Sequence, residues 1–187
     1  MEQYLQAFNI LNEEEIAAVL KAGNNRAIKK DDYFIRSGQT CKAVAFINKG
    51  IFRSFYINEK GEEITSCFMF AGSFVTAYAS FLTQCPTAEN IQAITPVEMI
   101  VIPHDFILEQ EKRSINWLRF LKLLAEQEYL RMEQRVLGLL KESAEKRYRD
   151  LLAKNPAYIQ FISLQHLASY LGITQRHLSR IRKAVTN

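Results

Sequence analysis

The chain has 187 residues, of which 48% are hydrophobic and 24% charged, a composition typical of one large or two small globular domains. No apolar run approaches the roughly 18 residues that a membrane-spanning helix needs, and the N-terminal residues do not resemble a signal peptide, so we expect a cytoplasmic protein. Cys41, Cys67 and Cys85 lie 26 and 18 residues apart, which is no metal-ligand spacing. We therefore predict no metal site and buried free thiols.

The net charge of +4 is unevenly distributed along the chain. Residues 1–113 carry 11 basic against 14 acidic side chains, whereas residues 114–187 carry 13 basic against 6 acidic side chains. No acidic residue follows Asp150. A mildly acidic first part joined to a basic second part is typical of a sensor attached to a nucleic-acid-binding domain.

The first predicted element is a short helix that begins after Asn12 and ends at Gly23, because Asn12 and Glu15 have the spacing of a capping box. From about residue 27 to residue 103, short alternating runs separated by turn residues indicate an antiparallel sandwich or barrel. The predicted strands are Tyr33–Ile35, Val44–Ile47, Ile51–Ile57, Glu63–Phe70, Ile91–Thr95 and Glu98–Ile102. A short helix and a loop are expected between Phe74 and Thr87.

A long helix is predicted from about Ser114, because apolar residues recur there at spacings of three and four. Its apolar stripe consists of Leu118, Leu121, Ala125, Tyr129, Met132, Val136 and Leu140. A second apolar set near its start means that the helix has two surfaces to bury. We expect the β-domain to cover one, and a second copy of the helix to cover the other across Leu118, Leu121, Ala125, Tyr129 and Met132. The alternative is a helix packed only within its own monomer.

A charged helix over residues 141–154 follows and is predicted to end at Asn155-Pro156. The last segment contains two short helical patterns on either side of Gly172. Gly172 permits the left-handed backbone of a sharp turn, and Thr174 is placed to cap the next helix. The apolar positions of the two helices are Leu164, Leu167, Ala168 and Leu171, followed by Leu178 and Ile181. This is the pattern of a helix-turn-helix.

The outward face of the second helix carries side chains suited to base edges. Glutamine suits adenine, arginine suits guanine, and a small serine allows a close approach. We predict that Gln175, Arg176, Ser179 and Arg180 contact bases in the major groove of DNA. The alternative is a two-helix hairpin with an ordinary solvated basic face.

Several turn and strand residues occur in a recognisable order. They are Ser37-Gly38, Val44-x-Phe46-Ile47-x-x-Gly50-x-x-Arg53 and Lys60-Gly61-Glu62. This order resembles the β-roll of the cyclic-nucleotide-binding domain, and with the helix-turn-helix the whole chain resembles the Crp/Fnr superfamily of transcription regulators. The resemblance implies an α+β fold with an N-terminal antiparallel, jelly-roll-like β-roll. It also implies a division into a sensor domain (1–113), a dimerisation helix (114–140) and a DNA-binding domain (141–187).

Matched family positions imply further contacts to the DNA backbone. These residues are Ser163, Thr174, His177 and Lys183. For His177 the alternative is a solvated side chain without a role. The β-hairpin wing that commonly follows the recognition helix in the family has no counterpart after Lys183.

The resemblance is weakest where family members bind cyclic AMP. Their Gly-Glu and Arg-Ser pairs are matched here by Thr76-Ala77 and Thr87-Ala88, and no arginine or lysine lies between Lys60 and Lys112. A phosphate would lack its charge-assisted fork, and Glu89 would repel it. We therefore predict no cofactor, no cyclic AMP binding and, if there is an effector, a smaller or more neutral molecule. The pocket residues implied are Thr76, Ala77, Tyr78, Thr87, Ala88, Asn90, Ala125 and Tyr129.

The sequence thus predicts a cytoplasmic homodimeric transcription regulator. Its expected partners are double-stranded DNA, a second copy of the chain, RNA polymerase and a small-molecule effector, with no membrane. The alternative is a ligand-binding regulatory subunit whose terminal helices dock on another protein. An enzyme is not expected, because no nucleophile–base pair or metal cluster is apparent.

Overall fold

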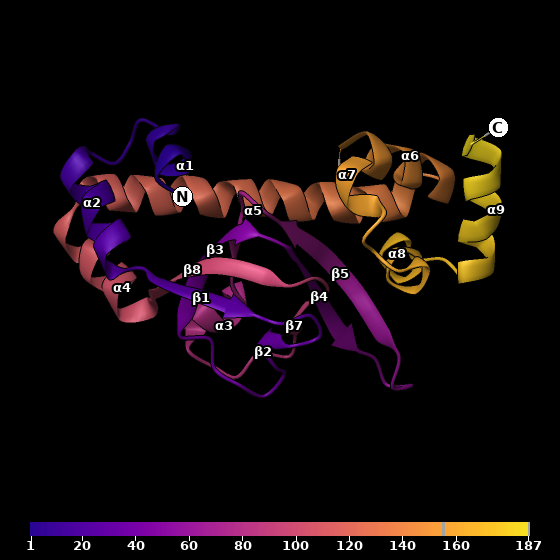
Figure 1. Ribbon diagram of the computed structural model, residues 1–187, viewed down its shortest axis with the longest axis horizontal. Helices are drawn as coiled ribbons and strands as arrows, with labels where there is room; N and C mark the ends of the chain where they lie inside the picture. Colours follow the sequence, from indigo (N-terminus) through magenta and orange to yellow (C-terminus); the bar gives the residue numbers. More distant parts are fainter. Residues whose placement is uncertain (155, 187) are drawn as a thin grey trace. The chain divides into compact units, whose positions relative to one another are not determined.

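The computed structural model describes residues 1–154 and 156–186 as an α+β chain with two antiparallel sheets (Figure 1). The helices are α1 (Glu2–Gln6), α2 (Glu13–Ala22), α3 (Tyr78–Thr83), α4 (His104–Arg113), α5 (Ile115–Lys141), α6 (Ala144–Lys154), α7 (Pro156–Ile159), α8 (Leu164–Leu171) and α9 (Gln175–Thr186). The strands are β1 (Asn24–Ile28), β2 (Tyr33–Ile35), β3 (Ala43–Lys49), β4 (Ile51–Ile57), β5 (Glu63–Phe70), β6 (Phe74–Val75), β7 (Asn90–Ala93) and β8 (Val97–Pro103).

Two compact units make up the chain. The first consists of Met1–Ser54 and Phe68–Glu126, and the second of Phe55–Cys67 and Gln127–Asn187. The hairpin end of β4 and β5 therefore belongs with the C-terminal helices, although both strands continue into the first unit. The predicted division at residues 113 and 140 stays a prediction.

The β-roll consists of two four-stranded sheets, with the strand orders β1-β8-β3-β6 and β2-β7-β4-β5. β3 and β8 pair over most of their length, with Phe46 opposite Ile100. Ile47, Phe52, Ile91 and Met99 are at most 1% exposed and form part of the core of the first unit. The predicted antiparallel β-roll is confirmed.

The predicted strands agree closely with the observed ones. Tyr33–Ile35, Ile51–Ile57 and Glu63–Phe70 are strands with the predicted bounds, and the predicted runs at 44–47, 91–95 and 98–102 differ from β3, β7 and β8 by one or two residues at their ends. The short helix expected between residues 74 and 87 is α3.

Five elements were not predicted from the sequence. They are α1, β1, β6, α4 and α7. Strand β1 is almost entirely exposed, so it lacks the alternation that marks a half-buried strand. Helix α4 buries Ile107 alone, and its three apolar residues, Phe106 to Leu108, are consecutive and so do not repeat at the three- and four-residue spacing that marks a helix in the sequence.

Helix α2 begins and ends as predicted. The Asn12 side chain accepts a hydrogen bond from the Glu15 N–H, and the Glu15 carboxylate accepts one from the Asn12 N–H. The same carboxylate contacts Ser114 and Asn116 at the start of α5. Burial alone would raise the pKa of Glu15, but the hydrogen bonds from Ser114, Asn12 and Asn116 outweigh it, so the pKa is lowered. The capping box therefore also ties α2 to α5, as these helices lie together in Figure 1.

The turn between β3 and β4 requires glycine. Gly50 has a φ of +98°, and a Cβ there would lie 2.3 Å from the Pro96 carbonyl oxygen. Any other residue would clash and adopt a strained backbone. This glycine is one of those that carried the resemblance to the β-roll.

The long helix α5 is confirmed, and Trp117 and Phe120 are buried at its start. The charged helix predicted from residue 141 instead begins at Ala144, because the Ser143 hydroxyl accepts a hydrogen bond from the Lys146 N–H and so caps a new helix. α6 ends at Lys154 and α7 begins at Pro156; Asn155, half of the predicted break, lies outside the described residues.

Candidate nucleic-acid interface

Helices α8 and α9 form the predicted helix-turn-helix around a small apolar core. Leu167, Leu171 and Leu178 are 0% exposed, and Ala168 is 2% exposed. Because Ala168 is small and fully packed, a longer side chain at this position would force the two helices apart. Ile181 is also buried and extends this core along α9.

The turn between the two helices has the geometry that its sequence predicts. Gly172 has a φ of 67° in the left-handed region, and the Ile173 N–H donates to the Ala168 carbonyl at 3.0 Å. Thr174 Oγ1 then accepts a hydrogen bond of 3.2 Å from the His177 N–H and caps α9. Ser163 Oγ caps α8 in the same way by accepting from the His166 N–H at 3.1 Å.

The predicted base-contacting side chains lie on one side of α9. Gln175, Arg176 and Arg180 are exposed and Ser179 is half-buried, while Leu178 and Ile181 face the core. The helix contains three arginines and a lysine but no acidic residue. A helix end that is basic, free of acids and exposed is suited to the negative potential of a DNA groove.

The residues predicted to contact the DNA backbone are exposed as well. Ser163, Thr174, His177 and Lys183 all have solvent-accessible side chains. Ser163 and Thr174 accept hydrogen bonds as helix caps, which uses oxygen lone pairs and leaves each O–H free to donate. Phosphate oxygens accept such hydrogen bonds, so capping and phosphate binding are compatible at both positions.

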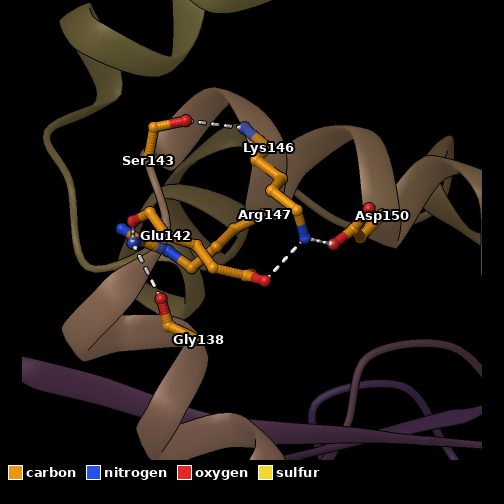
Figure 2. Close-up of polar contacts among 6 residues, drawn as sticks. All are labelled: Gly138, Glu142, Ser143, Lys146, Arg147 and Asp150. Carbon is orange, nitrogen blue, oxygen red and sulfur yellow. Dashed lines mark hydrogen bonds and ion pairs between the residues drawn. The ribbon is translucent and has the colours of Figure 1, made fainter.

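Two arginines that the sequence analysis did not single out hold the end of α8. Figure 2 shows Arg147 beside the junction of α5 and α6. Its guanidinium donates to the carbonyls of Gly138 at 3.3 Å, Glu142 at 2.5 Å and Leu171 at 2.8 Å. The first two carbonyls lie at the end of α5 and the third at the end of α8. One cation therefore joins the C-terminal ends of two helices, where the helix dipoles favour positive charge.

Arg135 on α5 makes the second contact of this kind. Its guanidinium donates to the Tyr170 carbonyl and lies 3.9 Å from the centroid of the Tyr170 ring. Lys146 of α6 in turn pairs with Glu142, which precedes that helix, at 2.5 Å and with Asp150 of α6 at 2.8 Å (Figure 2). No local sequence pattern marks Arg135 or Arg147, because most of their acceptors are distant in the sequence. Arg147 lies 9 residues from Gly138 and 24 from Leu171, and Arg135 lies 35 residues from Tyr170.

The residues predicted to form a dimer interface are only partly covered within one chain. Tyr129 and Met132 are each 66% exposed and Leu118 is 42% exposed, whereas Leu121 and Ala125 are half-buried. Further exposed apolar side chains follow on α5, namely Leu130, Val136, Leu137, Leu139 and Leu140. Contiguous apolar exposure of this kind is characteristic of an interaction surface.

The predicted effector residues lie in different environments. Ala77, Thr87 and Asn90 are buried, Tyr78 and Ala88 are exposed, and Thr76 Oγ1 donates to the Ala43 carbonyl at 3.0 Å. Ala125 is half-buried in the first unit, whereas Tyr129 belongs to the second. Thr87, Ala88 and Asn90 thus lie at the start of β7 or just before it, and the complete pocket stays a prediction.

Polar groups at this segment are held by the β-roll itself. Asn90 Oδ1 accepts a hydrogen bond of 3.1 Å from the Ser37 N–H, while its buried Nδ2 has no partner among the described residues. Ser54 Oγ donates to the Glu89 carboxylate at 2.5 Å. Burial raises the pKa of Glu89 and the hydrogen bond from Ser54 opposes that change. A half-buried acid at this position disfavours a phosphate ligand.

Two cavities of the first unit lie apart from the predicted effector residues. One of about 450 Å³ is lined by residues of α2, α4 and α5, among them Glu15, Arg113 and Asn116. The other, of about 330 Å³, is lined by residues that include Arg26 and Lys42. Neither is lined by any of the predicted effector residues.

The cysteines differ from the prediction. Cys41 is a buried free thiol, but Cys67 is half-buried and Cys85 is exposed. The prediction of buried thiols is therefore wrong for Cys85, which follows α3 in a surface loop. Across residues 1–154 and 156–186, no group of three or more histidine, cysteine or acidic side chains is arranged to hold a metal ion. In the same residues, no helix has the length and apolarity needed to span a bilayer.

Comparison with known proteins relates the β-roll to one family and most of the chain to several solved folds. Residues 25–114 match the family model of the cyclic nucleotide-binding domain. No curated protein matches the sequence. The chain resembles the solved structure of FixK2 from Bradyrhizobium japonicum with a TM-score of 0.77 at 16% identity, over 88% of this chain and 84% of that one.

Two further solved structures have the same fold over most of their length. A protein from Eubacterium rectale, assigned to the Crp/Fnr family of transcriptional regulators, aligns with a TM-score of 0.75 at 17% identity, over 98% of this chain and 88% of that one. The c-di-GMP-responsive global regulator CLP of Xanthomonas campestris aligns with a TM-score of 0.71 at 15% identity, over 94% and 92%. The chain thus resembles Crp/Fnr transcription regulators in fold.

Proposed function

We propose that this chain, which has the Crp/Fnr fold and matches the cyclic nucleotide-binding domain over residues 25–114, is a DNA-binding transcription regulator. The observation that carries the proposal is α9. It follows a left-handed Gly172 turn, packs on α8 through Leu178 and exposes Gln175, Arg176 and Arg180. A recognition helix in the major groove requires this combination of a fixed inner face and an exposed polar, basic outer face.

We further propose that the regulator acts as a homodimer whose two copies meet along α5. The exposed side chains of Tyr129, Met132 and Leu140 support this, because a second copy of the helix would remove them from water. Two recognition helices would then meet two half-sites of a palindromic operator, the usual arrangement for this motif.

The β-roll would serve as a sensor that does not use the cyclic-AMP contacts. Thr76-Ala77 and Thr87-Ala88 supply no charge, and the nearby Glu89 is an acid with a raised pKa. A ligand for this segment would accept a hydrogen bond from Asn90 Nδ2 and carry little negative charge. Such a ligand would be small and neutral, or cationic.

A mobility-shift assay with a duplex selected by the wild-type chain from a random pool tests the DNA-binding function. Replacing Arg180 by alanine should weaken specific binding by roughly 1–3 kcal/mol and relax the preference at one base position. Replacing Lys183 should weaken binding to all sequences about equally and reduce the salt dependence.

Arg149 provides the matched control, since it is an exposed arginine of the second unit that pairs with Glu145 and lies outside α9. Arg149→Ala should leave the sequence preference unchanged. If Arg180→Ala retained full affinity and preference, α9 would not be the recognition helix, and terminal helices that dock on a protein would become the better explanation.

A further inference from the structure

At the end of the β4–β5 hairpin, the edge strand β5 belongs to the same compact unit as the C-terminal helices. Phe55–Cys67 forms one compact unit with Gln127–Asn187. Among residues 1–154 and 156–186, β5 is the edge strand of its sheet, with β4 on one side and no strand on the other. The backbone N–H and C=O groups on its outer edge therefore need partners other than a strand.

Ser169 on α8 supplies the partner for two of these groups. Its hydroxyl donates to the Glu63 carbonyl at 3.0 Å and accepts from the Thr65 N–H at 2.9 Å. Residues two apart along a strand direct their backbone groups to the same edge, so one hydroxyl bonds both. Thr65 is only 2% exposed, and its N–H is consequently shielded from water.

The neighbouring residues of the same helical turn are held by other elements. Arg135 of α5 donates to the Tyr170 carbonyl, and Arg147 of α6 donates to the Leu171 carbonyl. Three consecutive residues of α8, Ser169 to Leu171, are thus bonded to β5, α5 and α6 respectively. Because Leu171 also lies in the buried core shared with α9, these bonds fix the direction of α9 relative to the hairpin.

We propose that Ser169 is a positioning residue for DNA binding, which couples the β4–β5 hairpin to the orientation of the recognition helix. The inference rests on the proposed function. The contact leaves the side chains of Gln175, Arg176 and Arg180 exposed, so it fixes an orientation and does not cover the DNA-binding face. Strands β4 and β5 continue into the β-roll, so the two hydrogen bonds of Ser169 join α8 to strands whose other ends belong to the sensor.

In a dimer, the orientation of the recognition helix can be measured through DNA affinity. Binding two half-sites at once requires two recognition helices at a fixed spacing and angle, whereas one half-site requires only one helix. Loss of the Ser169 contact should thus weaken binding to a duplex with two half-sites far more than binding to a single half-site.

The experiment compares Ser169→Ala with Ser169→Thr, which keeps the hydroxyl, in the full-length chain. The probes are a two-half-site duplex selected by the wild-type chain from a random pool and a duplex that contains one of its halves. Ser169→Ala should lower affinity for the first about tenfold and for the second less than about twofold, and threonine should restore most of the difference. Amide exchange at Thr65 should become about tenfold faster in Ser169→Ala alone.

Alanine favours helix, so the fold of α8 is expected to persist. Should Ser169→Ala fail to fold, Ser169→Cys, whose sulfur is a weak hydrogen-bond partner, should show the same direction of change. Equal losses on both duplexes, or unchanged binding despite faster Thr65 exchange, would overturn the positioning role and leave the proposed function intact. A wild-type chain that binds no duplex would overturn both.

Discussion

Arg147 gives the sharpest test of how the helix-turn-helix is held. Arg147→Ala removes three hydrogen bonds from a cation, two to the carbonyls of Gly138 and Glu142 (Figure 2) and one to the carbonyl of Leu171. A hydrogen bond to a charged group contributes roughly 1.5–3 kcal/mol. Arg147 as a whole is half-buried, so solvent screens these bonds in part, and we count the two shorter ones at the low end, about 1.5 kcal/mol each. The expected loss in the free energy of unfolding is about 3 kcal/mol.

The measurement is denaturant unfolding followed by helical circular dichroism, with a thermal scan beside it. For a chain of this size, about 3 kcal/mol corresponds to a melting temperature lower by roughly 6–12 °C. Arg147→Lys should recover less than half, because an ammonium group cannot reproduce the planar fork of the guanidinium.

Arg149→Ala is the matched control, because Arg149 lies two residues away and makes only an exposed ion pair with Glu145. Its loss should cost at most about 0.5 kcal/mol. If the two alanine variants unfolded with free energies within about 0.5 kcal/mol of each other, water would satisfy the helix-end carbonyls as well as Arg147 does. Arg147 would then not be what stabilises these helix ends.

Three further predictions concern assembly, effector and pH. Replacing Ala125 and Met132 together by glutamate should give monomers in sedimentation, since like charges would meet across the proposed interface; a stable dimer would place it elsewhere. Cyclic AMP at micromolar concentration should neither bind in calorimetry nor raise the melting temperature, and a micromolar dissociation constant would show that backbone amides replace the missing arginine. Because the folded state raises the pKa of Glu89 above its ordinary 4.5, it holds that proton more tightly than the unfolded chain. Stability therefore falls as pH rises from about 4.5 through the folded pKa, and Glu89→Gln should reduce this fall in unfolding curves at pH 4.5 and 7; an unchanged pH dependence would refute the assignment.

The sequence by itself determined the elements whose signals are local. The α2 capping box, the strand Ile51–Ile57 and the turn at Gly172 follow from residues within a few positions of one another. Helix caps, left-handed glycines and apolar periods depend on the backbone nearby, so the helix-turn-helix and its exposed α9 face could be predicted from the chain alone.

The tertiary structure decided how these elements are joined. The sequence pattern favoured one charged helix from residue 141, but Ser143 caps a separate α6 and Arg147 gathers carbonyls from two helices. The partners of Ser169 lie more than a hundred residues earlier in the chain. The pairing of such distant groups depends on which surfaces pack together in the folded chain. The spacing of residues along the sequence does not predict this packing.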